Sequence, residues 1–304
     1  MDPQPVSDQS LRAEGRRRLH MALLTTRAAR RYALGALPLT AALVLAGCSS
    51  NGEGGSAAGE TVTIGVEAEY PPGEYLDTDG ETVLGFNVEL VEAALAEMGL
   101  EAEWEPANFD AIIIGVNSGT YDMGSSSFTV TEQRMEEVDM VSYFSSGTQW
   151  FAQEGNPADV GPDDACGMRI AVQTGTTHDD DIEARSEACV EDGDDPITIE
   201  KFPNQPQATE TVVSGVNDAS LADMPTSAYA LDQTGDDVLE FIGDQYAAAP
   251  YGVVLHQDDT ERAEELAEAF NTIMENGTYD EILEEWGIDA GSIEAAEVNP
   301  SVDE

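Results

Sequence analysis

The sequence predicts an α/β fold in which helices cover a sheet, organised as two successive sets of units. From Glu60 onward, short β-rich runs alternate with amphipathic helical stretches, and a second set begins after Pro157. Without its first 47 residues the chain still has 257, which is enough for two lobes of ordinary domain size. We therefore expect two α/β lobes in one chain.

Residues 1–47 have the pattern of a signal peptide. Seven arginines precede an apolar run from Tyr32 to Gly47. A basic region, an apolar run and small residues before a cut are typical of a secretory signal. The run has 16 residues and contains Pro38, whereas a transmembrane helix needs roughly 20. We expect this segment to be removed on export.

The expected cut lies before Cys48, in a segment that looks like a bacterial lipobox. Leu45-Ala46-Gly47 precede the cysteine and a Ser/Gly-rich stretch follows it, so residues 48–59 are expected to form a flexible tether. A lipid on Cys48 would hold the protein at the extracellular face of the cytoplasmic membrane. An ordinary secretory signal with an incidental cysteine is the alternative. Met21 as the true start and twin-arginine export through Arg30-Arg31 also stay open.

The chain is extremely acidic. It has 61 acidic and 12 basic residues, a net charge of −49, and removal of residues 1–47 would leave 58 and 5, a net charge of −53. Such a field repels the phosphates of nucleic acids, which excludes them as partners. We expect most of the carboxylates to be solvated surface groups, with adaptation to a saline habitat as one explanation for their number.

Cys166 and Cys189 remain once Cys48 is assigned to the anchor. An even pair in an exported chain favours a disulfide because the compartment is oxidising, and two buried thiols are the alternative. A metal site is not expected, since the exported chain has only His178 and His256, and neither lies near a cysteine pair at ligand spacing. The sequence also contains no GxxxxGK phosphate loop, and no cofactor is expected.

The first set of units extends to about Gly124. Asn87 is expected to cap a helix that Gly99 stops, because the apolar residues between them recur with the 3.6-residue period. The other elements expected in this set are strands at 61–66, from 101 and from 121, and a short helix at 111–117.

The second set of units begins after Pro157. Its expected elements are strands at 168–172, 219–223 and 251–255, and a long helix at about 260–275. Thr278 to Glu281 has the capping-box pattern of a last helix, which Gly287 closes. The tail from Ala290 is acidic and lacks aromatic residues, so we expect it to be disordered.

Six segments resemble the polar amino acid class of extracellular solute-binding proteins, which includes lysine/arginine/ornithine- and glutamine-binding proteins. They are Ile64–Pro72, Leu84–Leu90, Asn108–Ile113, Thr129–Arg134, Val172–Thr177 and Asn276–Asp280. Each is modest alone, but all six occur in the family's order, and the resemblance extends from about Thr61 to Ile288. It implies a two-lobe periplasmic-binding-protein fold of type II that closes on a ligand in the interlobe cleft.

The resemblance also implies the domain organisation and the function. The expected parts are lobe 1 at residues 60–149 plus 251–288, lobe 2 at 150–250, an acidic tail at 289–304, and two crossover segments near Thr148–Ala152 and Ala247–Val253. The protein would capture a polar or cationic amino acid and deliver it to the membrane permease of an ABC transporter. It would act as a monomer and without catalysis.

Burial of a free amino acid requires a cationic and an anionic partner, because the ligand is a zwitterion. Arg134 is the candidate for the carboxylate, since a guanidinium offers a planar fork and the family's carboxylate-binding arginine aligns with it. A surface arginine paired with Glu136 or Glu137 is the alternative. Asp223 is the candidate for the ammonium group, because it follows an expected strand and the family's acid falls on it.

Small polar residues near Arg134 resemble the family's serine-rich ligand loop. Ser126, Ser127 and Thr129 would supply short donors and acceptors, or would form only a polar turn that bonds itself. Thr177 is expected where a helix opens, so that its amide and hydroxyl meet the ligand carboxylate. A helix-capping threonine is the competing interpretation, and the two roles are compatible.

A further group of residues would hold the ligand's side chain. Tyr70 and Phe109 align with the family's aromatic pair, with a core role as the alternative. Glu67 would meet a cationic side chain. Gln173 and His178 would line the pocket, with a surface or structural role as the alternative for the histidine. The family commonly has phenylalanine after the two prolines, but Gly73 stands there in this chain, which leaves the shape of the pocket open.

Two other classes of function stay open. Some relatives on this fold are enzymes that dehydrate arogenate or related cyclohexadienyl acids, and Glu67 is the one obvious candidate for their acid or base. An acidic adhesin or signalling ectodomain would respond to no small molecule. The sequence offers no convincing nucleophile arrangement, which favours the binding protein.

Overall fold

The computed structural model describes residues 60–235 and 237–302. The predicted signal peptide, the predicted lipid site at Cys48 and the predicted tether lie outside the described residues. Within the described ranges, no helix combines the length and the apolar character needed to cross a bilayer.

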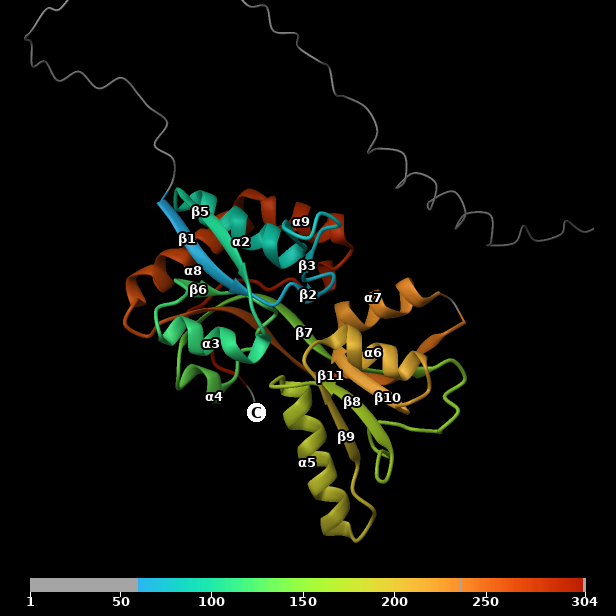
Figure 1. Ribbon diagram of the computed structural model, residues 1–304. Coiled ribbons are helices and arrows are strands. Elements are labelled where there is room, and N and C mark those ends of the chain that lie inside the picture. Colours follow the sequence, from blue (N-terminus) through green and yellow to red (C-terminus); the bar gives the residue numbers. More distant parts are fainter. Residues whose placement is uncertain (1–59, 236, 303–304) are drawn as a thin grey trace, which may run out of the picture. The chain divides into compact units, whose positions relative to one another are not determined.

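The first lobe is a parallel sheet covered by helices (Figure 1). Strand β1 lies between β5 and β6 and pairs with both in parallel. Helix α2 buries Val88, Val91 and Leu95, the apolar face that its 3.6-residue period predicts. The main elements are β1 (Glu60–Val66), α2 (Phe86–Glu97), β5 (Leu100–Pro106), α3 (Phe109–Asn117), β6 (Met123–Gly124), α4 (Glu132–Met135), α8 (Thr260–Asn276) and α9 (Thr278–Trp286).

The second lobe repeats this arrangement with its own core. Strand β8 lies between β10 and β9 and is parallel to both. Ile170, Leu221 and Trp150 belong to one buried cluster of this lobe. The elements are β8 (Arg169–Gln173), α5 (Thr177–Asp192), β9 (Thr198–Phe202), α6 (Gln205–Val213), β10 (Ala219–Asp223) and α7 (Met224–Thr234).

Two long antiparallel strands, β7 (Asp139–Gln153) and β11 (Leu239–Leu255), belong to both lobes. They complete one eight-stranded sheet in the order β5-β1-β6-β11-β7-β10-β8-β9. At one end of the pair β11 lies beside β6, and at the other β7 lies beside β10. The β7–β11 register shifts at several points between Ile242 and Gly252. Both predicted crossovers fall within these strands, whereas the lobe boundaries stay a prediction.

A small antiparallel sheet brings residues of the first lobe to the second. It consists of β2 (Glu69–Tyr70), β3 (Glu74–Leu76) and β4 (Val83–Leu84). The β2 strand contacts α6 of the second lobe. This contact is reinforced by a hydrogen bond of 2.6 Å from Asn204 Nδ2 to Glu69 Oε2. Residues next to β2 therefore lie where the lobes meet.

Two predicted helix starts are wrong. Gly85, not Asn87, precedes the first turn of α2, and the Asn87 side chain is buried inside the lobe, where it donates to Glu74 and Ser127. Gly277 takes the cap position of α9 in the left-handed conformation, so Thr278 already belongs to the helix. In both cases a glycine with positive φ permits a sharp entry that a side-chain cap would otherwise provide.

The predicted disorder of the tail is also wrong. After a short 3-10 turn, η1 (Asp289–Gly291), the chain returns to β7, where Val298 forms a bridge with Val141. Asn299 accepts from the Met140 amide at 2.8 Å, and Ala296 is buried. The composition suggested disorder, but a few apolar residues are enough to order the tail, because β7 offers both an apolar surface and free backbone groups.

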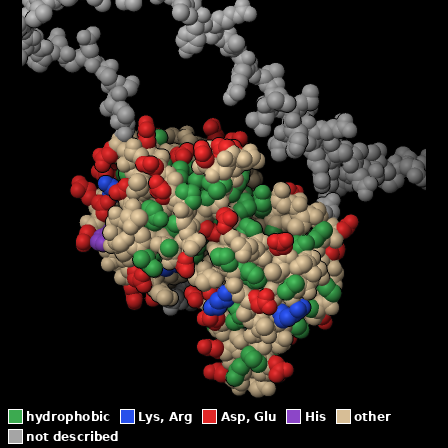
Figure 2. Space-filling model, viewed as in Figure 1, with side chains coloured by type: hydrophobic (Ala, Val, Ile, Leu, Met, Phe, Trp, Pro, Cys, Tyr) green, Lys and Arg blue, Asp and Glu red, His purple; other side chains and the backbone are tan. Residues whose placement is uncertain are grey.

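The predicted disulfide between Cys166 and Cys189 is confirmed, with an S–S distance of 2.00 Å. It ties the segment before β8 to helix α5. The predicted acidic surface is visible in Figure 2, where red carboxylates are scattered over the whole face shown and basic side chains are few. Lys201, the single lysine of the sequence, is shared between Asp179 and Glu183 at 2.8 and 2.6 Å.

Candidate ligand-binding site

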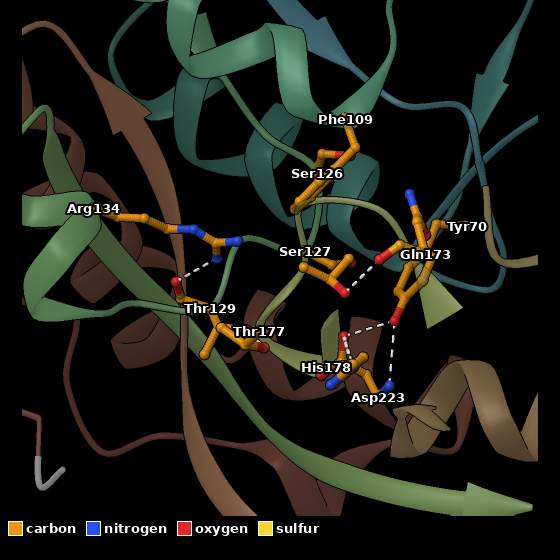
Figure 3. A pocket seen from close by; sticks show the side chains of 11 residues that line it. Tyr70, Phe109, Ser126, Ser127, Thr129, Arg134, Gln173, Thr177, His178 and Asp223 are labelled. Carbon is orange, nitrogen blue, oxygen red and sulfur yellow. Dashed lines mark hydrogen bonds and ion pairs between the residues drawn. The ribbon is translucent and has the colours of Figure 1, made fainter. Parts of the chain in front are cut away.

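One pocket collects the candidate residues from both lobes (Figure 3). It is lined by Tyr70, Phe109, Ser126, Ser127, Thr129, Arg134, Gln173, Thr176, Thr177, His178 and Asp223. All the predicted ligand residues except Glu67 are among them, and Glu67 is hydrogen-bonded to Gln173. The second-lobe residues lie at the carboxyl ends of β8 and β10, where α/β folds place their ligands.

Arg134 extends from α4 across the pocket rather than into solvent. Nη1 donates to the Thr129 carbonyl at 2.8 Å, and Nη2 reaches the Gly175 carbonyl of the second lobe at 3.3 Å. Loss of surrounding water lowers the pKa of Arg134 to about 10, with Asp180 and Asp223 acting in the opposite direction. The side chain is therefore a cation at neutral pH, and among the described residues it forms no ion pair with a carboxylate.

The Arg134 guanidinium also lies over two aromatic rings. Its central carbon is 5.6 Å from the centre of Phe109 and 5.4 Å from that of Phe128, and the two rings stack at 4.6 Å. Cation–π attraction of this kind orients a guanidinium without neutralising it. Phe109 thus holds the arginine in addition to lining the pocket.

Asp223 ends β10 and is the anionic group on the second-lobe side. Its Oδ2 accepts from the Tyr70 hydroxyl of the first lobe at 2.8 Å, and its own amide donates to the same hydroxyl oxygen at 3.2 Å. His178 Nε2 lies 3.7 Å from Oδ2, while His178 Nδ1 is 3.3 Å from the Thr148 hydroxyl on β7. Burial, with the negative charge of Asp223 next to it, raises the pKa of Tyr70 well above its ordinary value, so the phenol stays a donor.

Thr177 is the first residue of α5 and faces Thr129 across the pocket. Their hydroxyl oxygens are 3.5 Å apart. The helix cap is Thr176, whose hydroxyl accepts from the Asp179 amide at 3.2 Å. The alternative interpretation of Thr177 as the cap is therefore wrong by one residue, and its hydroxyl is directed to the pocket instead.

Glu67 and Gln173 form a buried polar pair, and Gln173 lines the pocket. Gln173 Nε2 donates to Glu67 Oε2 at 2.9 Å, and Glu67 is only 4% exposed. Burial raises the pKa of Glu67 to about 7. Its other oxygen, Oε1, is buried and has no hydrogen-bond partner among the described residues. A carboxyl group in this state can accept one more donor.

The pocket is closed in this conformation. The space open to the centre of a water molecule is about 10 Å³, which is about the room for one water. The polar groups of the two lobes bond one another instead, as Tyr70 does to Asp223 and Arg134 does to the Gly175 carbonyl. Each of these contacts crosses between the lobes.

The sequence as a whole matches known proteins. The model of bacterial extracellular solute-binding proteins, family 3, matches residues 62–289. The arginine-binding protein ArgT of Corynebacterium glutamicum is 35% identical over 241 residues, which is 78% of each protein. The chain belongs to family 3 of the bacterial extracellular solute-binding proteins.

Solved structures agree with this solute-binding family. An ancestral arginine-binding protein bound to arginine superposes with a TM-score of 0.69 at 28% identity, covering 75% of this chain and 99% of that one. An ancestral amino acid-binding protein, described as a precursor of cyclohexadienyl dehydratase, gives a TM-score of 0.65 at 26% identity, covering 74% and 95%. The two-lobe type II fold is thereby established.

Sequence reasoning missed the buried acid beneath the ligand loop of this solute-binding protein. Glu74 on β3 is 1% exposed and lies directly beneath Ser126 and Ser127. Burial raises its pKa to about 8. Nothing in the sequence distinguished it from the many solvated acids, because only the fold shows which carboxylate is enclosed. The neighbouring departure at Gly73 was the one available signal.

Proposed function

We propose that this solute-binding protein captures a free amino acid with a cationic side chain, arginine or a close relative, and presents it to the permease of an ABC importer. One observation carries the proposal: Arg134 of the first lobe and Asp223 of the second line the same pocket. A guanidinium and a carboxylate so placed match the carboxylate and the ammonium group of a zwitterion.

A cationic side chain is favoured by Glu67. Its buried Oε1 lacks a partner within the described part of the chain, and its Oε2 is bonded to Gln173, which lines the pocket. A ligand cation there would lower the pKa of Glu67 and ionise it, which replaces a costly desolvated acid by a paired charge. The arginine named for ArgT and for the ancestral protein supports the same ligand class.

Binding would use lobe closure. The ligand carboxylate would take the place of the carbonyls that Arg134 now binds, and the ligand ammonium would compete with Tyr70 for Asp223. Entry requires the lobes to separate, because the closed pocket has room for about one water. A ligand that contacts both lobes favours the closed state, which is the form that a permease would recognise.

The thermal stability of the purified exported chain tests this proposal. We expect stabilisation by arginine, lysine or ornithine and less by citrulline, which is neutral. A ligand at about a thousand times its Kd adds roughly 4 kcal/mol. Arg134→Ala and Asp223→Ala are each expected to abolish the effect while the chain stays folded.

Arg169→Ala and Asp218→Ala are the matched controls, because these residues pair with each other at 2.8 Å on the surface of the second lobe. They are expected to leave the ligand effect unchanged. Retained stabilisation in both pocket variants would rule out the proposed site. Turnover of arogenate by the wild-type chain would instead establish the enzyme alternative.

We also propose that Cys48 carries a lipid that anchors the exported protein. The support is the sequence pattern before Cys48 and the extracellular family to which the chain belongs. Mass spectrometry of the N-terminal peptide from membranes should show a diacylated cysteine. An unmodified Cys48 in secreted protein would contradict the anchor.

A further inference from the structure

A buried polar cluster lies beneath the ligand-facing serines and consists of Glu74, Asn87, Ser126 and Ser127. All four are less than 7% exposed. Ser127 Oγ donates to Glu74 Oε1 at 2.9 Å, and Ser126 Oγ lies 3.4 Å from the same atom. Asn87 Nδ2 bridges Glu74 Oε2 at 2.6 Å and Ser127 Oγ at 2.8 Å.

The hydrogen bonds of Ser127 determine what its hydroxyl offers to the pocket. A serine hydroxyl has one hydrogen to donate and two lone pairs that accept. When Glu74 is ionised, as a bound ammonium group favours, the hydrogen is directed to Glu74 and one lone pair is taken by Asn87. The remaining lone pair is left for the pocket that Ser127 lines, so the residue presents an acceptor there. An acceptor suits an N–H donor such as a ligand ammonium group.

Gly73 makes this arrangement possible. A Cβ atom at position 73 would lie 2.9 Å from Asn87 Nδ2 and 2.9 Å from Ser127 Oγ, which is closer than real Cβ contacts. Any side chain at position 73 would therefore displace the groups that hold Ser127. The absence of a side chain at this position thus has a structural consequence inside the binding site.

Ser127 needs such support because its backbone is strained. Its φ is +49°, a left-handed conformation that costs a residue with a side chain roughly 1 kcal/mol. Side-chain hydrogen bonds to two buried partners compensate for this cost. Without them we expect the serine to relax and its hydroxyl to turn away from the pocket.

We propose that Glu74 is a positioning residue of the ligand site: with Asn87 it holds Ser127 as a hydrogen-bond acceptor for the ligand's α-ammonium group, in space that Gly73 leaves free. The proposal rests on the proposed amino acid binding but assigns a role to a residue that does not contact the ligand. This role gives a functional reason for the buried carboxyl group of Glu74. The charge of Glu67 disfavours ionisation of Glu74.

Isothermal titration of the exported chain with L-arginine tests the proposal. Glu74→Leu removes the acceptor and is expected to raise Kd about tenfold, the loss of one hydrogen bond to a charged group. Gly73→Ala should do the same by displacing Asn87 and Ser127. Glu74→Gln should also raise Kd, because its amide must direct the NH2 group either at Ser127 Oγ or at Asn87 Nδ2, and a flipped Asn87 would no longer donate to Ser127.

Val83→Ala is the matched control. Val83 is buried on β4, pairs with Leu76 of β3 and belongs to an apolar cluster with Val66, Ala68 and Val88, none of which lines the pocket. It should lower Tm and leave Kd unchanged, which separates lost stability from lost positioning. Equal Kd values for wild type, Glu74→Leu and Gly73→Ala would overturn the proposal.

A ligand-independent measurement keeps the inference separate from the proposed function. In urea unfolding, Glu74→Leu and Ser127→Ala are expected to be non-additive, since both remove the same hydrogen bond. Additive effects would exclude the bond, whatever the ligand is. Failure of wild type to bind L-arginine, with a non-additive cycle, would contradict the proposed ligand and leave the positioning contact supported.

Discussion

At the scale of single residues, the pocket depends on buried carboxyl groups in unlike surroundings. Asp223 accepts a hydrogen bond from the Tyr70 hydroxyl and has His178 Nε2 at 3.7 Å, whereas Glu67 and Glu74 have little surrounding water and only neutral partners. Burial raises the pKa of Glu67 to about 7 and that of Glu74 to about 8. Most acids of this chain are solvated, whereas the fold encloses Glu67 and Glu74 among neutral groups.

These shifts predict a pH-dependent stability. Both folded-state pKa values lie above the unfolded value of about 4.3, so between pH 4.5 and 8 the folded chain holds protons that the unfolded chain releases. Stability should therefore fall as pH rises through this window, by up to about 1.4 kcal/mol per pH unit for each group. In Glu74→Gln the fall should be shallower, as measured by urea unfolding at pH 5, 6, 7 and 8. Repulsion among the other acids is common to both proteins, so parallel curves would mean that Glu74 does not hold its proton.

At the scale of elements, short segments decide how the lobes meet and how the chain ends. The three-residue strand β3 carries Glu74 to the underside of the ligand loop, and α4, only four residues long, directs Arg134 across the pocket. The C-terminal tail adds an edge contact to β7 through Val298. These elements are too short for periodicity to reveal them, so their positions follow from their contacts.

Removal of the tail tests its role. A chain ending at Ile288 loses the burial of Ala296, the Val298 bridge and the hydrogen bonds of Asn299 to Met140 and Asp139. We expect its free energy of unfolding to fall by about 2–4 kcal/mol, the sum of one small apolar contact and a few hydrogen bonds. Arginine affinity should persist, because the tail is outside the pocket.

Glu294→Ala, a change of an exposed tail residue, is the control for that truncation and should leave urea unfolding unaltered. An unchanged midpoint for the truncated chain would show that the packed tail adds nothing to stability.

At the scale of the whole molecule, the main feature is the excess of negative charge. The sequence has a net charge of −49, and Figure 2 shows carboxylates over the visible face with few cations to pair with them. Like charges at such density repel one another and destabilise the compact state. The repulsion between exposed groups is screened by salt, since the Debye length falls from about 10 Å at 0.1 M to about 3 Å at 1 M.

We therefore expect Tm to rise as NaCl increases from 0.1 to 2 M, as measured by differential scanning fluorimetry without ligand. Replacement of NaCl by an equal osmolality of sucrose controls for effects that do not involve charge. A flat or falling Tm in NaCl would show that the acids do not limit stability.

The sequence by itself indicated the α/β class, the strands β1, β5, β6, β8 and β10 with the end of β11, the disulfide pair and the residues that the pocket collects. Periodicity and apolar alternation record burial locally, so α2 and β10 could be predicted, and Arg134 and Asp223 were found because their motifs resemble the family's. The helix starts at Gly85 and Gly277 could not be predicted, because the sequence does not show which glycines adopt a positive φ.

Only the tertiary structure decided that Glu74 is enclosed, that Asn87 faces Ser127 and that the tail packs on β7. These facts depend on contacts between segments 13 to 160 residues apart, such as Asn87 with Glu74 and Asn299 with Asp139. A sequence does not show whether an Asp or Glu is solvated or buried. The chemistry of its carboxyl group is set by the groups that the fold brings around it.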